Sequence, residues 1–214
     1  MATADLGKDD VRGLLVKLAI PAITAQLINA LYNIVDRVYV GHIPGDGNLA
    51  LTGLGVGFPI IMFLSAFASL IGQGGAPLAA IYMGKKDNEK AEKMLGNCFT
   101  LLVVSAILLM IVVQYFKRPI LFMVGASENT IAYAEDYLGI YLLGTLPVLL
   151  ALGLNMFINT QGFSKTSMLT VLIGAIANII LDPIFIYGFD MGVKGAAYAT
   201  ILSQTISAVW VLKF

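Results

Sequence analysis

Charge is scarce in this chain of 214 residues, where Asp, Glu, Lys and Arg make up 12% and hydrophobic residues 58%. A soluble domain of this size carries about 25% charged residues. So little charge cannot cover a surface that faces water, which excludes an ordinary cytosolic enzyme and an intrinsically disordered chain. The 13 basic and 13 acidic residues cancel, so no excess positive charge remains to bind nucleic acid.

The chain is also poor in residues that carry covalent or metal chemistry. Cys98 is the single cysteine and His42 the single histidine. A lone cysteine excludes an intrachain disulfide framework, and a lone histidine leaves no histidine cluster for zinc. We therefore predict that the protein is not an enzyme and holds no covalent cofactor.

Long apolar stretches are what the sequence has in abundance. A membrane-spanning helix needs about 20 mostly apolar residues, and the alternation of apolar and polar residues that marks barrel strands is missing from these stretches. The six candidate spans are residues 14–40, 49–83, 95–116, 130–157, 168–187 and 195–212. We predict an all-α integral membrane protein, a single six-helix transmembrane lobe over residues 1–214, in the cell membrane.

The basic residues between these spans predict the orientation of the lobe. Loops on the cytoplasmic side of a membrane carry an excess of Lys and Arg. Here one side holds nine of these residues and the other three, which predicts that both termini are cytoplasmic. The nine are Lys8, Arg12, Lys17, Lys85, Lys86, Lys90, Lys93, Lys165 and Lys213, and the three are Lys117, Arg118 and Lys194.

Three charged residues lie deep inside the predicted spans: Asp36, Arg37 and Asp182. An intramembrane carboxylate is costly and usually lines a cavity, an ion path or a proton relay. An Asp side chain is too short to reach the headgroups, so we expect a functional role for both carboxylates. The long stem of Arg37 can reach the headgroups, and both interpretations stay open for it.

A polar stripe on the first predicted helix ends at one of these carboxylates. Gln26, Asn29, Asn33 and Asp36 recur at spacings of three, four and three residues, which places them on one helical face. Lipid cannot satisfy such a stripe, and contacts between packed helices usually need only one or two polar residues. Four residues in line favour a face toward a water-filled cavity.

The fifth and sixth predicted helices repeat the theme. Asn178 and Asp182 are four residues apart and share a face, as do Ala196 and Thr200. At about 1.5 Å per residue, Asp182 and Thr200 lie roughly 9 Å below the outer ends of their helices.

The same estimate puts Asp36 and Tyr137 in this outer layer, at depths of roughly 7 Å and 11 Å. Asn155, in contrast, falls near the cytoplasmic end of its helix. Two carboxylates, an amide oxygen and a hydroxyl suit a sodium ion, and two neighbouring carboxylates can instead share a proton. These residues are compatible with either sodium or protons as the coupling ion.

Several short motifs, in order along nearly the whole chain, resemble the multidrug and toxic compound extrusion (MATE) family, and in particular the amino-terminal lobe of its DinF-type branch. The most specific is Asn-Ile-Ile-Leu-Asp-Pro-Ile-Phe at 178–185. The others are Leu-Ala-Ile-Pro at 18–21, Asn-Ile-Val-Asp at 33–36 followed by Val-Gly-His at 40–42, Gly-Val-Gly-Phe-Pro at 55–59, Gly-Lys-Lys-Asp-Asn-Glu-Lys-Ala at 84–91 and Met-Gly-Val-Lys-Gly-Ala-Ala at 191–197.

The resemblance implies a protein with two six-helix lobes around a central cavity, which exchanges inward sodium or protons for outward amphipathic, often cationic, compounds. It implies a cation site in this lobe and a cavity network on the fourth helix. The implied site residues are Asp36, Asn178, Asp182, Thr200 and a backbone carbonyl near Ala196, and the implied cavity residues are Tyr137 and Asn155. Where the family often has Gln on the first helix, this chain has the shorter Asn29.

We therefore predict a cation-coupled antiporter that exports amphipathic or cationic compounds and works with a second lobe, either a carboxy-terminal half or a parallel copy of this chain. One alternative is a flippase for lipids or polyprenyl-linked compounds, which would line its cavity with several arginines where this chain offers Arg37. Another is a membrane partner subunit without transport activity, which would not need two carboxylates and two amides in one layer.

Overall fold

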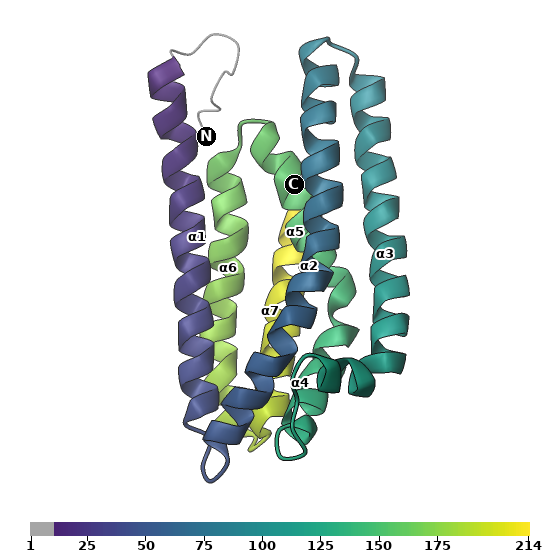
Figure 1. Ribbon diagram of the computed structural model, residues 1–214. Coiled ribbons are helices and arrows are strands. Elements are labelled where there is room, and N and C mark those ends of the chain that lie inside the picture. Colours follow the sequence, from purple (N-terminus) through teal and green to yellow (C-terminus); the bar gives the residue numbers. More distant parts are fainter. Residues whose placement is uncertain (1–10) are drawn as a thin grey trace.

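Helices form nearly all of residues 11–214, the part of the chain that the computed structural model describes (Figure 1). They are α1 (Val11–Gly41), α2 (Gly47–Gly84), α3 (Asn88–Met123), α4 (Ile131–Leu143), α5 (Thr145–Thr160), α6 (Ser164–Pro183) and α7 (Gly192–Lys213). A π-helical turn, η1 (Ile184–Gly188), joins the last two.

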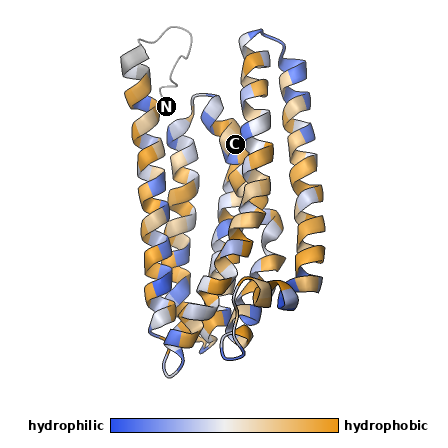
Figure 2. Cartoon of the chain, in the orientation of Figure 1, coloured by the Kyte–Doolittle hydropathy of each residue, from blue (hydrophilic) through white to orange (hydrophobic). Residues whose placement is uncertain are grey.

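The helices run side by side as a bundle with two ends. We call one the His42 end, which holds the loops at 42–46, 124–130 and 189–191, and the other the Lys85 end, which holds the loops at 85–87 and 161–163. Figure 2 shows apolar residues along most of the helix length, with polar residues gathered near the loops. Within the described chain, five helices are long and apolar enough to cross a membrane, and the bent pair α4–α5 adds a sixth span. The predicted all-helical membrane fold is confirmed.

The fourth predicted span is two helices rather than one. α4 and α5 meet at an angle of 60°, and the break between them lies at Gly144. A Cβ atom at position 144 would collide with the side chain of Ile201 on α7. The bend therefore lies where a glycine allows α7 to approach the backbone closely, and Pro147 falls in the first turn of α5, where a missing N–H costs little.

The third helix extends beyond its apolar stretch at both ends. α3 starts at Asn88 because the Asp87 side chain accepts a hydrogen bond from the backbone N–H of Lys90, at 3.2 Å, and so caps the first turn. Hydropathy alone misses such a polar, capped turn, which explains why the apolar stretch 95–116 is shorter than the helix.

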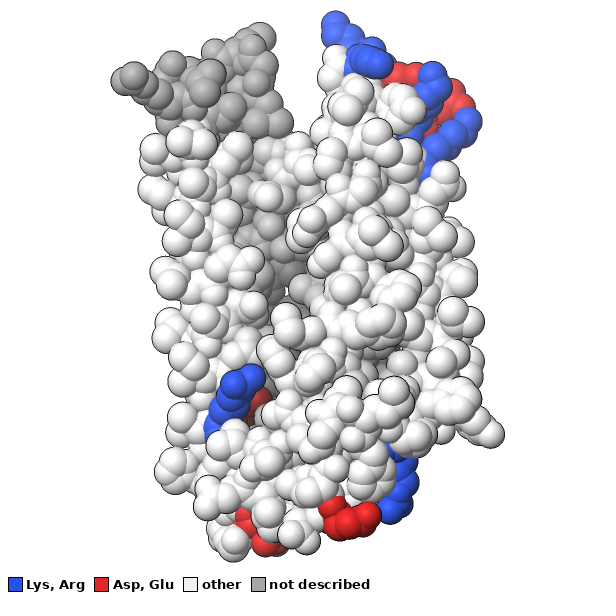
Figure 3. All heavy atoms as spheres, in the orientation of Figure 1, with Lys and Arg blue, Asp and Glu red and all other residues white. Residues whose placement is uncertain are grey.

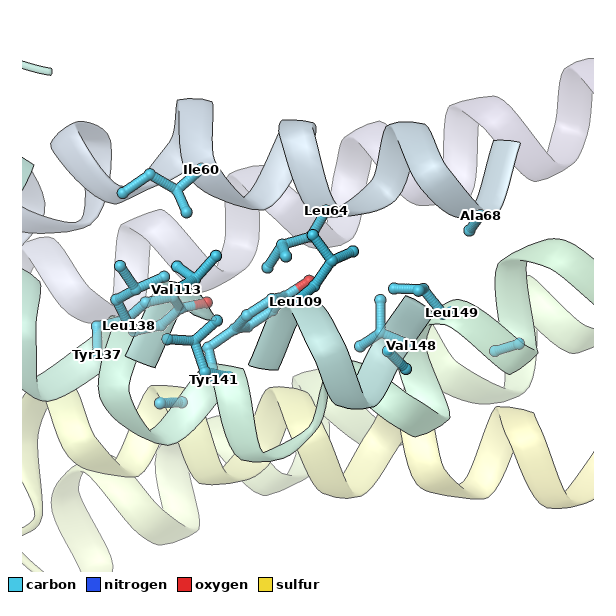
Figure 4. Close-up of a cluster of buried hydrophobic side chains, with 14 of the residues drawn as sticks. Ile60, Leu64, Ala68, Leu109, Val113, Tyr137, Leu138, Tyr141, Val148 and Leu149 are labelled. Atoms are coloured by element: carbon cyan, nitrogen blue, oxygen red, sulfur yellow. The ribbon is translucent and has the colours of Figure 1, made fainter. Parts of the chain in front are cut away.

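A tightly packed core joins α2, α3, α4 and α5. Figure 4 shows Leu64 of α2, Leu109 of α3, Leu138 of α4 and Leu149 of α5 among the buried side chains of one apolar cluster, and three of the four have no exposed surface. In contrast, α1 packs mainly along α6 and makes far fewer contacts with α2. This leaves the polar stripe of α1 beside a hollow rather than inside the core.

Charged side chains gather at the two ends of the bundle on the face drawn in Figure 3, with few between them. At the His42 end, two ion pairs tie α4 to its neighbours: Arg118 with Glu135 at 3.7 Å, and Lys194 with Asp136 at 3.4 Å. At the Lys85 end, Lys90 pairs with Asp87 at 2.7 Å, and this hydrogen bond lowers the pKa of the Asp87 carboxyl.

Candidate functional site

The polar stripe of α1 lines two cavities that share part of their walls. Gln26 and Asn29 line the larger one, Asp36 lines the smaller one, and Asn33 lines both. The side-chain N–H of Asn33 donates to the backbone carbonyl of Asn29 at 2.7 Å. The predicted stripe therefore faces a cavity along its whole length.

The smaller cavity is a chamber of about 260 Å³, to which α1, α2, α4 and α7 contribute side chains. Asp36 is 8% exposed there, and its Oδ1 atom has no hydrogen-bond partner among residues 11–214. Tyr137 and Thr200 line the same chamber. The structure thus brings the predicted residues of three helices together at one point.

Asn178 and Asp182 form a polar pair inside the protein, one turn apart on α6. The amide N–H of Asn178 donates to Oδ1 of Asp182 at 3.2 Å, and Asp182 has no exposed surface at all. Oδ2 of Asp182 and Oδ1 of Asn178 are buried without a hydrogen-bond partner in the described chain. The Asp182 and Asp36 carboxylates are close enough for their charges to interact.

Three buried acceptor oxygens without donors are costly to a folded protein, at about 1–3 kcal/mol each. A cation or a proton supplied to Asp36, Asn178 and Asp182 would remove this cost. Ala196 can contribute only its backbone, since its side chain is a methyl group, and its carbonyl oxygen accepts a hydrogen bond from Thr200 Oγ1 at 2.9 Å. Because this hydroxyl donates its proton there, its oxygen lone pairs stay available to a cation.

The donor set selects among ions. In the described part of the chain, no three side chains of His, Cys, Asp or Glu come together, so the arrangement lacks the ligands that zinc and other transition metals prefer. Two carboxylates, an amide oxygen and a hydroxyl are hard oxygen donors. They fit a small monovalent cation or a shared proton.

Asn155 lies apart from this cluster. It lines the larger cavity, of about 1210 Å³, and does not line the chamber of Asp36. Its amide N–H donates to the backbone carbonyl of Ser167 at 3.2 Å, while its Oδ1 atom is buried without a partner among the described residues.

Several residues of the chamber were not identified from the sequence. Tyr141 stacks on Tyr137 with ring centroids 6.1 Å apart, and Gln204 and Phe58 also line the chamber. The sequence could have identified two of these residues by their spacing. Tyr141 follows Tyr137 by four residues and Gln204 follows Thr200 by four, so each shares a helical face with a predicted site residue. Phe58 could not have been identified in this way, since aromatic residues are common in any membrane helix.

Comparisons with known proteins identify the family of this chain. The MatE family profile matches residues 21–184. This chain belongs to the MatE family. Members of the family are transporters and not enzymes, and their location in the cell membrane agrees with the spans described above.

Relatives and solved structures extend the match. The chain is 29% identical over 192 residues to the multidrug export protein MepA of Staphylococcus haemolyticus, covering 90% of this chain and 42% of MepA. A structure described as an outward-facing multidrug resistance MATE family transporter of the MOP superfamily is 28% identical, with a TM-score of 0.87 over 95% of this chain and 44% of that one. A MOP superfamily transporter from Pyrococcus furiosus, described as having a binding pocket of reverse polarity, is 27% identical, with a TM-score of 0.89 over 99% of this chain and 47% of that one. The chain therefore spans less than half the length of each of these relatives.

Proposed function

We propose that this chain forms the cation-binding lobe of a MATE transporter that exports amphipathic compounds in exchange for sodium or protons. The observation that carries the proposal is the set of three buried, unpartnered oxygens on Asp36, Asn178 and Asp182. A partner subunit without transport activity would have no use for such a costly arrangement.

The geometry supports a simple form of coupling. Asp36 lines the chamber, and we place the ion between it and the buried Asn178–Asp182 pair, so that Asp36 would serve both the solute space and the ion site. A monovalent cation bound at Asp36 and Asp182 offsets one of their two negative charges, and a solute with a positive group would compete for Asp36. Competition of this kind is what exchange transport requires, because the two ligands must bind the lobe in turn.

The proposed orientation places the Lys85 end and both termini in the cytoplasm, as the Lys and Arg distribution predicts. The ion site then lies in the outer half of the membrane. Labelling of single cysteines in a Cys98→Ala background would check this, and accessibility of position 42 only after permeabilisation of the membrane would reverse it.

We also propose that transport needs a second lobe, a carboxy-terminal half or a parallel copy of this chain. The large cavity has α1 on one side, whose cavity-lining Gln26 is exposed, and lipid there would leave polar groups unsatisfied. Native mass spectrometry from a mild detergent would reveal the second lobe. A monomer that drives uphill export would contradict this requirement.

The transport proposal is tested with proteoliposomes that take up a cationic amphiphile, the ethyl ester of rhodamine B. Uptake is measured with an imposed sodium gradient at constant pH and with an imposed pH gradient without sodium. Uptake driven by one of these gradients supports the proposal and names the coupling ion. Uptake equal to that of protein-free liposomes under both gradients would contradict it.

A lipid flippase is the second candidate, and Arg37 is the residue that would favour it. Among the described residues that line the two cavities, Arg37 is the only basic one. A cavity that binds a lipid pyrophosphate would be expected to present several arginines. The single guanidinium favours export of smaller amphiphiles.

A further inference from the structure

We propose, building on the transport function above, that Arg37 is the binding group for an anion, so that the exported amphiphile carries a carboxylate or phosphate beside its apolar part. Arg37 lines both the chamber and the large cavity. It follows Asp36 directly in the chain, so the chamber offers a carboxylate and a guanidinium side by side, and the large cavity shares only the guanidinium.

The charge of the large cavity differs from what a purely cationic solute would need. Of the described residues that line it, Arg37 alone is charged at neutral pH, and the remaining polar ones are amides, hydroxyls and phenols. A guanidinium repels a solute whose only charge is positive. The wall of the larger cavity therefore favours a solute with a negative group.

The guanidinium is positioned but not neutralised by a direct ion pair. Its central carbon lies 5.2 Å from the centre of the Phe58 ring, a cation–π contact that fixes one face of the group. None of the ion pairs within the described chain involves Arg37. Stacking on a ring leaves the N–H groups at the edge of the guanidinium free, and that edge matches a carboxylate or phosphate with two parallel hydrogen bonds.

The neighbouring elements contribute no competing charge. Phe58 and Ile61 of α2, Tyr141 of α4 and Gln204 of α7 line both cavities with Arg37. These side chains can hold the apolar body of an amphiphile, and the amide of Gln204 can add a hydrogen bond. Asp36 next to Arg37 can accept a positive group, so a zwitterionic amphiphile satisfies both charges at once.

The coupling mechanism fits such a solute. When the coupling cation occupies Asp36, the positive group of a zwitterion has no partner, and the solute keeps only its contact with Arg37. When the cation leaves, both contacts form. Exchange is therefore retained, and Arg37 adds selectivity for solutes with a negative group.

The test uses two dyes that differ at one position. Rhodamine B has a free carboxylate and its ethyl ester does not, while both carry the same cationic ring system. Fluorescence anisotropy of each dye with the purified protein gives the ratio of the two affinities. We expect rhodamine B to bind about tenfold more tightly than the ester, the value of a hydrogen-bonded charge pair.

Substitutions assign this preference to the guanidinium. Arg37→Gln should reduce the preference to about one, and Arg37→Lys should keep part of it, because Lys retains the charge but not the paired N–H groups. Arg118→Gln is the matched control: it makes the same change at the His42 end, where Arg118 pairs with Glu135, and should leave the preference intact. Arg37→Lys keeps the test decisive if Arg37→Gln does not fold.

Each possible outcome decides for or against the anion site. A ratio that is the same in the natural protein, Arg37→Gln and Arg37→Lys would overturn the proposal, as would tighter binding of the ester by the natural protein. Displacement of rhodamine B by phosphatidylglycerol in the natural protein, but not in Arg37→Gln, would support the anion site and identify a lipid headgroup as its source. Two results separate this proposal from the transport function. A preference for rhodamine B that depends on Arg37, without dye uptake under either gradient, would support the anion site and contradict the transport function. Gradient-driven uptake of the ester, with a dye preference that does not depend on Arg37, would support the transport function and overturn the anion site.

Discussion

The Asn178–Asp182 pair and the wall of the large cavity are both polar, but they differ in burial and in size. The pair is buried inside the bundle and lines neither cavity, and two of its oxygens lack donors within the described chain. The cavity wall borders about 1210 Å³, the size of an organic solute site, and its side chains Gln26 and Gln73 are exposed. We infer from this contrast that ion and solute are held in separate places, which meet at Asp36.

The largest expected effect comes from the residue where the two regions meet. Asp36→Asn keeps the shape of the side chain but removes the charge that the ion and a positive solute group share. We expect gradient-driven dye uptake to fall to the level of protein-free liposomes, with the folded protein retained, because neutralising a buried unpaired charge does not destabilise. Uptake and thermal unfolding are measured on the same preparation.

The control for this variant is Glu128→Gln, which removes a carboxylate from the exposed loop before α4. It should transport like the natural protein. Equal transport by both variants would show that Asp36 has only a structural role.

Helix packing, in contrast to either polar region, should control stability without affecting ion selectivity. A Cβ atom at Gly72 would lie 2.7 Å from the backbone oxygen of Gly153 on α5, whereas one at Gly74 would contact nothing within 4 Å. We expect Gly72→Ala to lower the free energy of unfolding by about 1–3 kcal/mol and Gly74→Ala to raise it by up to about 1 kcal/mol. Denaturant titration of both variants checks this, and equal stability would refute the close α2–α5 approach.

A moderate effect is expected from the cavity wall alone. Gln73→Ala removes an exposed polar side chain from the large cavity and leaves the ion site untouched. Binding of rhodamine B should weaken by about threefold, the value of one neutral hydrogen bond, while the gradient that drives uptake stays the same. A change of coupling ion in this variant would show that the two regions are not separate.

The smallest effect should come from a charge outside both regions. The hydrogen bond from Lys90 lowers the pKa of Asp87, so this carboxylate favours the folded state above its unfolded pKa. That contribution is lost as the pH falls through the lowered, folded-state pKa. Asp87→Asn should therefore melt slightly below the natural protein at pH 7, and the difference should vanish in acid. A difference that grows as the pH falls would contradict this sign.

Much of this arrangement could be predicted from the sequence because lipid imposes strict patterns. The apolar stretches predicted the spans, and the three- and four-residue spacings on α1 and α6 predicted which polar groups share a face. The break at Gly144 could not be predicted, since it depends on the approach of Ile201 from a distant part of the chain. The contact between Arg37 and Phe58 could not be predicted for the same reason. It joins two different helices, and no spacing within one helix indicates it.

Asp182→Asn separates the ion from the solute, because the proposed coupling ion is held by the buried pair and the solute by the cavity. Asp182 does not line either cavity, so its loss should spare the solute. The measurement is gradient-driven uptake of the rhodamine B ester at a dye concentration that saturates binding, with equilibrium dye binding recorded on the same sample. We predict normal binding and no uptake under either gradient; uptake at the natural rate, or loss of binding together with uptake, would contradict the separation of the two sites.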